Sequence, residues 1–224
     1  MSEPSGPYRA VIFDMDGVLV DSEPAFFEAV NLVLAEEGRS VDWERYRRFL
    51  GTSVEETWRG VIAMLGMRGD APEYVRRYED VLLDCLRRPR PPLPGVVELL
   101  DELERRGAPV ALATSSWREW ADVVLEGAGL RERFRHLATG DAVANEKPAP
   151  DTYLLAAGLL GIEPPSCVAI EDTPPGIASA KAAGMYAVQV RASSTAFPPI
   201  DGADLVIDSL AYFPVAMVAT APTS

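Results

Sequence analysis

Short apolar segments alternate with helical segments along the second part of the chain, after residue 94. Parallel strands need a crossover connection between them, and a helix is the usual one, so this alternation predicts a parallel sheet covered by helices. The predicted helices are residues 96–106, 117–128, 151–160 and 174–183, and the predicted strands are residues 109–113, 136–139, 168–170, 186–190 and 205–207.

A further strand is predicted near the N-terminus, at residues 8–13. Its sequence, YRAVIF, is largely apolar on both faces, which is typical of a parallel strand with helices above and below it. We therefore predict an α/β fold whose Rossmann-like parallel sheet combines this strand with the segments after residue 94.

Residues 21–90 carry helical patterns and no strand pattern. Ser22 and Pro24 predict a helix start, because a capping residue is followed by an early proline. Further helices are predicted at residues 42–50, 54–65 and 73–87, and the proline-rich segment RRPRPPLPG is predicted to be a stiff connector. We predict a core domain of residues 1–20 and 91–224, with a helical domain of residues 21–90 inserted into it.

The charge balance limits which partners the chain can bind. Its 224 residues include 21 Lys and Arg against 34 Asp and Glu, which gives a formal net charge of −13 at pH 7. No basic cluster follows the spacing of a phosphate backbone, so we expect no nucleic-acid partner. A small anionic substrate would need cations at its site, such as a metal ion, to overcome the overall repulsion.

The cysteines and the N-terminus indicate the compartment. Cys85 and Cys167 are far apart and form no CxxC motif, which favours reduced, buried thiols. The N-terminal segment lacks a basic region, and Asp14 and Asp16 interrupt its apolar run, so neither a signal peptide nor a membrane span is expected. We expect a cytoplasmic, monomeric protein with no membrane partner.

Four polar groups are expected at the carboxyl ends of the strands, where open parallel sheets bind their ligands. They are Asp14 and Asp16 after the first strand, Thr114, Ser115 and Ser116 after PVALA, Lys147 in NEKPAPD, and Glu171 and Asp172 in VAIEDTPPG. Asp14, Glu171 and Asp172 offer the carboxylate oxygens that Mg²⁺ prefers.

Two of these acids suit phosphoryl transfer. Asp14 can act as a nucleophile that forms an aspartyl-phosphate. Asp16, two residues on and on the same side, can give a proton to the leaving oxygen and later take one from water. We expect the neighbouring carboxylate to raise the pKa of Asp16. The Thr114 hydroxyl and the Ser115 amide are expected to hold phosphoryl oxygens, with Lys147 supplying positive charge.

Each group also has a purely structural interpretation. An aspartate at a strand end often forms a turn, and the TSS triplet can cap the next helix. Lys147 can be a solvated loop lysine, and Glu171 and Asp172 can stand at a helix N-terminus, where the helix dipole favours acids. Chemistry is favoured because all four groups occur in order, each at the correct end of a predicted strand.

In that order the four groups closely resemble the motifs of the haloacid dehalogenase superfamily of phosphohydrolases. FDMDGVLVDSE resembles its DxD signature, ALATSS its Ser/Thr motif, KPAPD its lysine motif and IEDTPPGI its acidic metal motif. The resemblance implies a nucleophile at Asp14, an acid and base at Asp16, phosphate binding by Thr114 and Lys147, and Mg²⁺ held by Asp14, the Asp16 carbonyl and Asp172, with Glu171 assisting.

The helical insert resembles the cap of the subgroup that contains β-phosphoglucomutase, phosphoglycolate phosphatase and sugar-phosphate phosphatases. Haloacid dehalogenation is disfavoured, because those enzymes lack the second aspartate of DxD, which is Asp16 here. A mutase is also disfavoured, since Phe26 and Val54 stand where β-phosphoglucomutase has a cap histidine and a phosphate-binding arginine. Arg76 and Arg77 on a cap helix could partly replace the second phosphate site that a mutase requires, although the pattern favours solvated surface arginines.

The leading hypothesis is therefore a Mg²⁺-dependent phosphatase that hydrolyses a small phosphorylated metabolite, with a sugar phosphate as the expected substrate. Gly51, Thr52 and Glu56 of the cap are expected to line the substrate pocket together with Thr114, Ser115, Ser116 and Lys147. Two alternatives stay open. One is a β-phosphoglucomutase-like phosphomutase, and the other is a regulatory or binding protein that keeps the fold without turnover.

Overall fold

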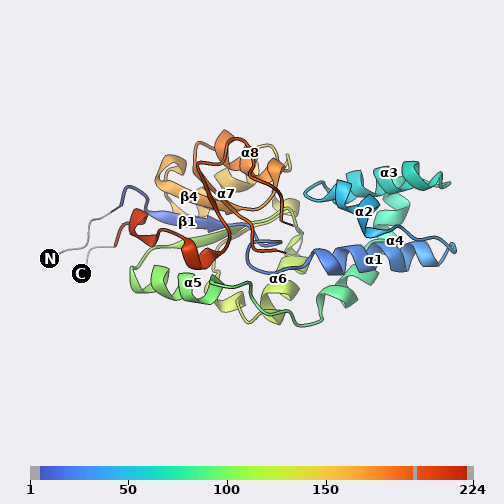
Figure 1. The fold of residues 1–224 in the computed structure, drawn as a ribbon, viewed down its shortest axis with the longest axis horizontal. Coiled ribbons are helices and arrows are strands. Elements are labelled where there is room, and N and C mark those ends of the chain that lie inside the picture. The colour runs from blue at the N-terminus through green and yellow to red at the C-terminus, as the bar shows by residue number, and fades with distance from the viewer. Residues whose placement is uncertain (1–5, 194–195, 221–224) are drawn as a thin grey trace.

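The sheet is central to the fold in the computed structural model, which describes residues 6–193 and 196–220 (Figure 1). Within these residues, six parallel strands lie in the order β3-β2-β1-β4-β5-β6. They are β1 (Ala10–Phe13), β2 (Val110–Ala113), β3 (Leu137–Ala138), β4 (Cys167–Glu171), β5 (Tyr186–Val190) and β6 (Leu205–Ile207). The predicted Rossmann-like α/β fold class is confirmed.

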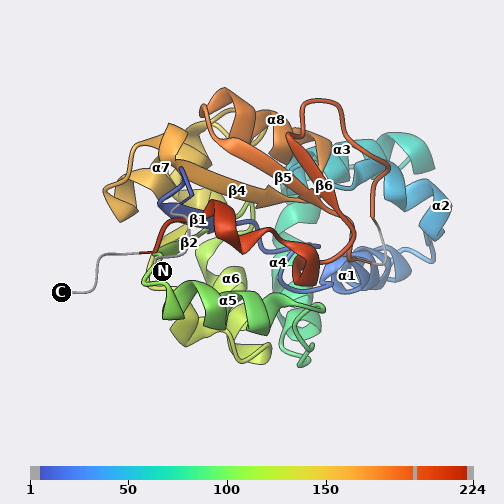
Figure 2. The same ribbon diagram turned by 60° about the vertical axis from the view of Figure 1, so that its left-hand side comes forward.

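Helices cover both faces of the sheet, α5 and α6 on one face and α7 and α8 on the other (Figure 2). Side chains alternate along β1, so that Val11 and Phe13 belong to one buried cluster and Ala10 and Ile12 to the other. The second cluster is rich in alanine, which allows α7 and α8 to pack closely on the strands. These helices are α5 (Val96–Arg105), α6 (Arg118–Gly127), α7 (Asp151–Leu160) and α8 (Pro174–Ala182).

The first four α-helices after β1, which are α1 to α4, lie beside the sheet rather than on it, and we call them the cap (Figure 1). They are α1 (Glu23–Ala35), α2 (Trp43–Tyr46), α3 (Val54–Leu65) and α4 (Ala71–Leu86). Their own core includes Trp58, which stacks on Tyr74 with ring centroids 5.1 Å apart. The division into residues 1–20 with 91–224 and residues 21–90 stays a prediction, and residues 1–5 lie outside the described residues.

The two connectors between cap and core lie side by side. The backbone N–H of Leu93 donates to the Leu19 carbonyl at 2.9 Å, and Val20 forms an isolated antiparallel bridge with Pro92. Because both connectors are short and paired, a rotation of the cap about this point would leave the sheet and its strand ends intact.

Some element boundaries differ from the predicted ones. Only Trp43–Tyr46 of the predicted helix 42–50 is α-helical, and the rest tightens into a 3₁₀ turn before Gly51, whose φ of 77° ends the helical path. The first strand begins at Ala10, because Tyr8 pairs instead with Val218 in an isolated bridge. The short 3₁₀ turns are η1 (Arg47–Phe49), η2 (Arg131–Arg133), η3 (Gly140–Ala142), η4 (Pro164–Ser166), η5 (Leu210–Tyr212) and η6 (Val215–Met217).

Both cysteines are free and buried, as predicted. No helix in the described part of the chain combines the length and the apolar character needed to cross a membrane. The expected cytoplasmic location and monomeric state stay predictions.

Candidate active site

Lys147 joins two of the predicted acids at the carboxyl end of the sheet. Its Nζ donates to Asp14 Oδ1 at 2.7 Å, to Glu171 Oε1 at 2.5 Å and to the Ala113 carbonyl at 3.0 Å. The side chains of Lys147, Asp14 and Glu171 are 5%, 9% and 1% exposed. Asp14 follows β1 and Glu171 ends β4, so the parallel register of these neighbouring strands brings the two acids together. Lys147 is therefore a buried ion-pair partner and not a solvated loop residue.

The acids outnumber this cation. Carboxylate oxygens of Asp14, Glu171 and Asp172 lie within 4.8 Å of one another. Burial raises the pKa of Asp14 well above its ordinary value, although Lys147 opposes the shift. Burial also raises the pKa of Asp172 well above its ordinary value, with Glu171 and Asp14 adding to the effect.

An orphaned oxygen marks where a cation would fit. Asp172 Oδ1 is buried and has no hydrogen-bond partner among the described atoms. A buried carboxylate oxygen without a partner is costly unless a cation or a proton compensates it. Together with Asp14 it presents the hard oxygen ligands that suit Mg²⁺, so these residues fit the predicted metal.

Two glycines allow the backbone to approach these acids closely. A Cβ at Gly17, which has a φ of 80°, would lie 2.0 Å from Asp172 Oδ2. A Cβ at Gly176 in α8 would lie 1.9 Å from Glu171 Oε1. Glu171 Oε2 accepts hydrogen bonds from the backbone N–H groups of Asp172 at 2.9 Å and Thr173 at 3.2 Å. Because Oε1 accepts from Lys147, both oxygens of this carboxylate have hydrogen-bond partners.

Hydroxyl groups hold Asp16 on the neighbouring side of the site. Ser22 Oγ donates to Asp16 Oδ1 in a short hydrogen bond, and Ser116 Oγ donates to Asp16 Oδ2 at 2.9 Å. The surrounding protein raises the pKa of Asp16 by desolvation, while the hydrogen bonds from Ser22 and Ser116 oppose the shift. The predicted direction is therefore correct, but the predicted cause is wrong, because burial and not a neighbouring carboxylate dominates.

Ser22 differs from its predicted role as a helix cap. It occupies the position before α1, yet its side chain makes no capping hydrogen bond. Its backbone is already helical, with φ −96° and ψ −15°, and its hydroxyl turns to Asp16 instead. A capping serine accepts a hydrogen bond from a backbone N–H, whereas here the Ser22 hydroxyl donates to the Asp16 carboxylate.

The predicted substrate-binding residues divide between the cavity wall and the layer beneath it. Ser115, Ser116 and Lys147 line a cavity of about 870 Å³ between core and cap. Thr114 is buried and is not among the described lining residues, and its Oγ1 accepts a hydrogen bond from the Ser116 N–H at 3.0 Å. It also lies 3.4 Å from Asp16 Oδ2, so the structure places Thr114 beside the predicted acid.

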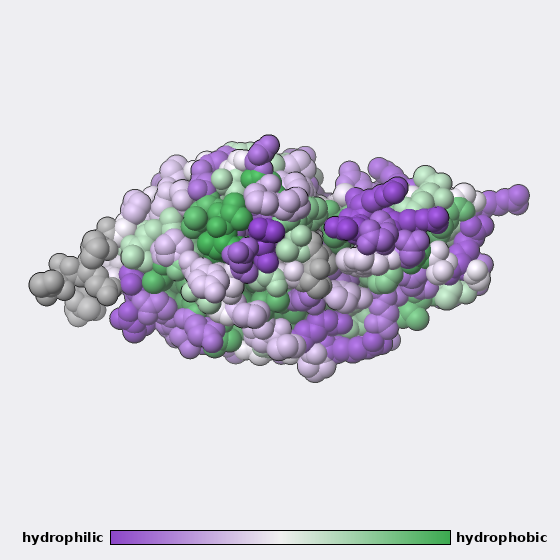
Figure 3. All heavy atoms as spheres, viewed as in Figure 1, coloured by the Kyte–Doolittle hydropathy of each residue, from purple (hydrophilic) through white to green (hydrophobic). Residues whose placement is uncertain are grey.

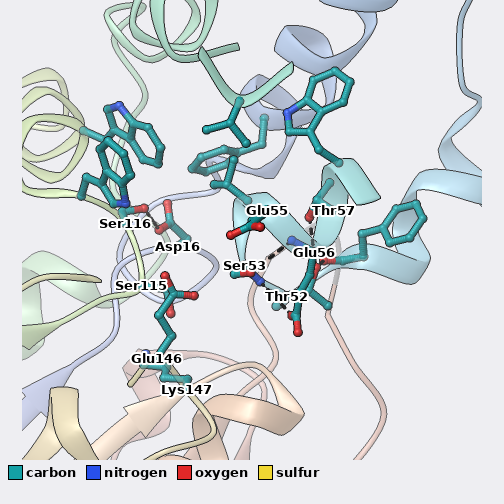
Figure 4. A pocket seen from close by; sticks show the side chains of 18 of the residues that line it. Asp16, Thr52, Ser53, Glu55, Glu56, Thr57, Ser115, Ser116, Glu146 and Lys147 are labelled. Atoms are coloured by element: carbon teal, nitrogen blue, oxygen red, sulfur yellow. Dashed lines mark hydrogen bonds between the residues drawn. The ribbon is translucent and has the colours of Figure 1, made fainter. Parts of the chain in front are cut away.

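On the cap side, Gly51, Thr52 and Glu56 line the same cavity. Figure 4 shows Thr52 and Glu56 at its wall. Thr52 Oγ1 donates to the Phe49 carbonyl at 2.7 Å, and Glu56 forms a capping box with Ser53 at the start of α3. Gly51 is where the cap meets the core, because a Cβ there would lie 3.2 Å from the side chain of Thr173.

Aromatic side chains form much of the remaining wall. Trp117 and Trp120 stack with ring centroids 5.0 Å apart, and Trp117 is 40% exposed. Both line the cavity, as do aromatic residues of the cap. The aromatic lining residues are Phe26, Tyr46, Phe49, Trp58, Tyr78, Trp117 and Trp120.

Glu23 is a lining residue that the sequence did not single out. It begins α1, and burial raises its pKa to about 8, with Asp16 and then Asp21 adding to the effect. In the sequence it looked like an ordinary acid in the first turn of a helix. No local signal shows that this first turn faces Asp16, because that depends on how the cap sits on the core.

Comparison with known proteins gives a consistent assignment. Residues 8–184 match the family model of haloacid dehalogenase-like hydrolases. The fructose-1-phosphate phosphatase YqaB of Escherichia coli is 36% identical over 191 residues, which cover 82% of this chain and 97% of that protein. Protein SUPPRESSOR OF QUENCHING 1, chloroplastic, of Arabidopsis thaliana is 36% identical over 83% of this chain, and the match covers 18% of that much longer protein.

A solved structure agrees with the sequence matches. The crystal structure of a CbbY variant from Rhodobacter sphaeroides in complex with xylulose-1,5-bisphosphate has a TM-score of 0.82 at 26% identity, over 94% of this chain and 99% of that one. The predictions of this superfamily and of a phosphoric monoester hydrolase are confirmed. With the DxD segment, Lys147 and the Glu171-Asp172 pair brought together in one site, the chain belongs to the haloacid dehalogenase-like hydrolase family.

Proposed function

We propose that this protein is a Mg²⁺-dependent phosphatase that hydrolyses small phosphorylated metabolites through an aspartyl-phosphate on Asp14. The observation that carries the proposal is the convergence of Asp14, Lys147 and Asp172 from separate parts of the chain around one buried point. Asp16 stands next to this point, held by Ser22 and Ser116.

The metal would be held by Asp14, the Asp16 carbonyl and Asp172, with Glu171 assisting. When bound, Mg²⁺ supplies positive charge beside the phosphoryl oxygens, where charge accumulates during transfer. Lys147 contributes a second positive charge, and its bond to Asp14 Oδ1 also fixes the orientation of the carboxylate.

In the first step, an Asp14 carboxylate oxygen attacks phosphorus, and the bond from phosphorus to the ester oxygen breaks. Asp16 donates its proton to that leaving oxygen, which departs as an alcohol. The raised pKa of Asp16 supports this role, because a raised pKa keeps more of the carboxyl group protonated near neutral pH.

In the second step, water attacks the phosphorus of the aspartyl-phosphate, and Asp16 now accepts a proton from that water. The bond from phosphorus to Asp14 breaks, which restores the Asp14 carboxylate and releases inorganic phosphate. The hydrogen bonds from Ser22 and Ser116 stabilise Asp16 in the ionised form that this step requires.

A sugar phosphate is the proposed substrate class. The YqaB relative, whose name gives fructose 1-phosphate as its substrate, supports this choice. The cavity of about 870 Å³ has room for a leaving group of several carbon atoms beyond the phosphate. Gly51, Thr52 and Glu56 are proposed to contact that leaving group, together with Ser115 and Ser116.

Phosphate release from a panel of esters, with and without Mg²⁺, tests the proposal. Release should require the metal and should disappear in Asp14→Asn, whose amide is a poor nucleophile. Asp201→Asn, which removes an exposed loop carboxylate, is the matched control and should remain active. Undiminished release by Asp14→Asn would refute the assignment of the nucleophile.

The two alternatives are weakened by particular residues. A phosphomutase must hold a second phosphate on the cap, but Val54 lines the cavity there and Arg77 is bound to Glu36 and Glu37. Of the two arginines, Arg76 lines the cavity and stays a candidate for such a site. Conversion of β-glucose 1-phosphate to glucose 6-phosphate with little phosphate release would support the mutase instead. A non-catalytic protein would not need Asp14, Asp16, Lys147 and Asp172 together, and failure to form a beryllofluoride adduct with Mg²⁺ bound would support it.

A further inference from the structure

Carboxylates dominate the part of the cavity that lies beyond the phosphate site. Besides Asp14, Asp16 and Glu171, the lining residues include the acids Glu23, Glu55, Glu56 and Glu146. Within the described residues, Arg76 is the one guanidinium that lines the cavity. Hydrophilic side chains also gather on the visible face of the cap where it adjoins the core (Figure 3).

These acids approach one another from opposite sides of the cavity. Glu55 and Glu56 begin α3 on the cap, whereas Glu146 precedes Lys147 on the core (Figure 4). Although Glu146 is exposed, partial burial raises the pKa of its carboxyl group, and Glu56 and then Glu55 add to the effect. The acids of the cap and the core therefore act on each other electrostatically across the space that a leaving group would occupy.

Few cations offset these charges. Glu55 bonds to Arg59 at 2.5 Å, so its charge is partly balanced from outside the cavity. Glu56 bonds to Ser53, and neither it nor Glu146 forms a salt bridge within the described parts of the chain. A second anionic group on the substrate would thus meet Glu56 and Glu146, and Arg76 is the one guanidinium among the described lining residues that could attract it.

The same wall can bind hydroxyl groups. Trp58 Nε1 is buried without a hydrogen-bond partner in the described structure, although Trp58 lines the cavity. This N–H is a donor that a substrate oxygen could satisfy. Burial raises the pKa of Glu23, whose carboxyl group also lines the cavity and can accept a hydrogen bond from a substrate hydroxyl. The aromatic side chains supply apolar surface for the carbon skeleton of such a leaving group.

We propose that the cavity selects substrates whose leaving group is uncharged and hydroxylated, as in a monophosphorylated sugar or polyol, and that Glu56 and Glu146 reject substrates with a second phosphate or a carboxylate. This inference rests on the proposed phosphatase function and narrows its substrate class. The substrate that this inference assigns to the chain carries one phosphate, whereas the ligand in the CbbY structure is a bisphosphate.

Sorbitol 6-phosphate and 6-phosphogluconate form a matched pair for the test, because they differ only in a far-end CH₂OH or carboxylate. We expect kcat/KM to favour sorbitol 6-phosphate at least about tenfold at low salt, as expected for like charges roughly 6–8 Å apart. The preference should narrow as ionic strength rises. Equal kcat/KM values, or a preference for 6-phosphogluconate, would overturn the inference.

Charge-neutralising variants show whether the two acids cause the preference. Each of the variants Glu56→Gln and Glu146→Gln should raise kcat/KM for 6-phosphogluconate severalfold and so reduce the ratio of the two kcat/KM values. Glutamine at residue 56 can keep the capping box. Glu98→Gln removes an exposed carboxylate from α5 outside the cavity and should leave the ratio unchanged. A ratio that both cavity variants leave unchanged would show that these acids do not set the specificity.

Binding separates this inference from the proposed function. Calorimetric titration of Asp14→Asn with each ester in the presence of Mg²⁺ compares affinities without turnover. Tighter binding of sorbitol 6-phosphate supports the selection even if the wild-type protein releases no phosphate. Binding of neither ester, or equal or tighter binding of 6-phosphogluconate, overturns the selection even if the wild-type protein hydrolyses other esters.

Discussion

Replacing Lys147 with methionine should destabilise the protein far more than the same replacement of a surface lysine. Lys147 Nζ bonds to Asp14 at 2.7 Å and to Glu171 at 2.5 Å, and its side chain is 5% exposed. Methionine keeps the length and apolar stem of the side chain but removes the charge. Two buried carboxylates then lose their cation, while Asp172 remains beside them.

Lys181 provides the matched control. Its Nζ bonds to Asp204 Oδ2 at 2.7 Å, the same distance as the Lys147–Asp14 pair, but its side chain is 39% exposed. Removing one partner of a buried ion pair costs about 3–5 kcal/mol, whereas an exposed pair contributes roughly 0.2–1 kcal/mol. In a chain of this size, 3–5 kcal/mol corresponds to a fall in Tm of roughly 6–20 °C.

The assay is urea-induced unfolding followed by circular dichroism, at pH 8 with EDTA, for the wild type, Lys147→Met and Lys181→Met. A free energy of unfolding lowered by about 3–5 kcal/mol in Lys147→Met alone would agree with the structure. Equal losses in the two variants would refute the conclusion that Lys147 compensates buried charge.

The pH dependence provides a second check, and its sign follows from Asp14. Burial raises the folded-state pKa of Asp14 above its unfolded value, and Lys147 opposes that shift, so Lys147→Met raises the pKa further. A carboxyl group with a raised folded-state pKa contributes stability below its unfolded pKa of about 3.9, and this contribution is lost as pH rises through the folded pKa. The loss in Lys147→Met should therefore be largest near pH 8 and shrink towards pH 4. A loss that grows as pH falls would contradict the reasoning.

Three further perturbations test other contacts. Gly176→Ala places a Cβ 1.9 Å from the Glu171 carboxylate and should lower both the Tm and the Mg²⁺-dependent activity. Gly158→Ala, with open space around it in α7, is the control and should stabilise the helix by about 0.5–1 kcal/mol. Thermal unfolding and phosphate release measure these effects. In a single turnover, which follows the first step alone, Asp16→Ala should slow release of an alkyl alcohol by about 10²–10⁴ but slow release of p-nitrophenolate much less, since that leaving group needs no proton. Equal slowing of this first step for both esters would exclude Asp16 as the acid. Mg²⁺ should raise the Tm of the wild type, and a thermal scan should show no such rise in Asp172→Asn, which removes the orphaned carboxylate.

Several features of this protein follow from the sequence because they depend on neighbouring residues. The apolar pattern of β1 predicts a covered parallel strand, and Asp14 and Asp16 follow it directly, so their position at a strand end needs no tertiary information. The boundaries of α3 and α7 agree with the predicted ranges for the same reason, since α3 has a local capping box and both helices end at a glycine with positive φ. The order of the motifs along these elements then predicts the family and the main site residues.

Tertiary structure decided which partner each side chain meets. Lys147 is 133 residues from Asp14 in sequence, and only the folded sheet shows that it is buried against that acid rather than solvated. The Ser22 hydroxyl bonds to Asp16 instead of capping α1, and Glu23 and Trp58 line the cavity because the cap stands over the strand ends. That Glu146 lies across the cavity from Glu56 depends on the same placement of the cap. Local propensity and periodicity act over a few residues, whereas burial, charge pairing and pKa shifts depend on every group that the fold brings within several ångströms.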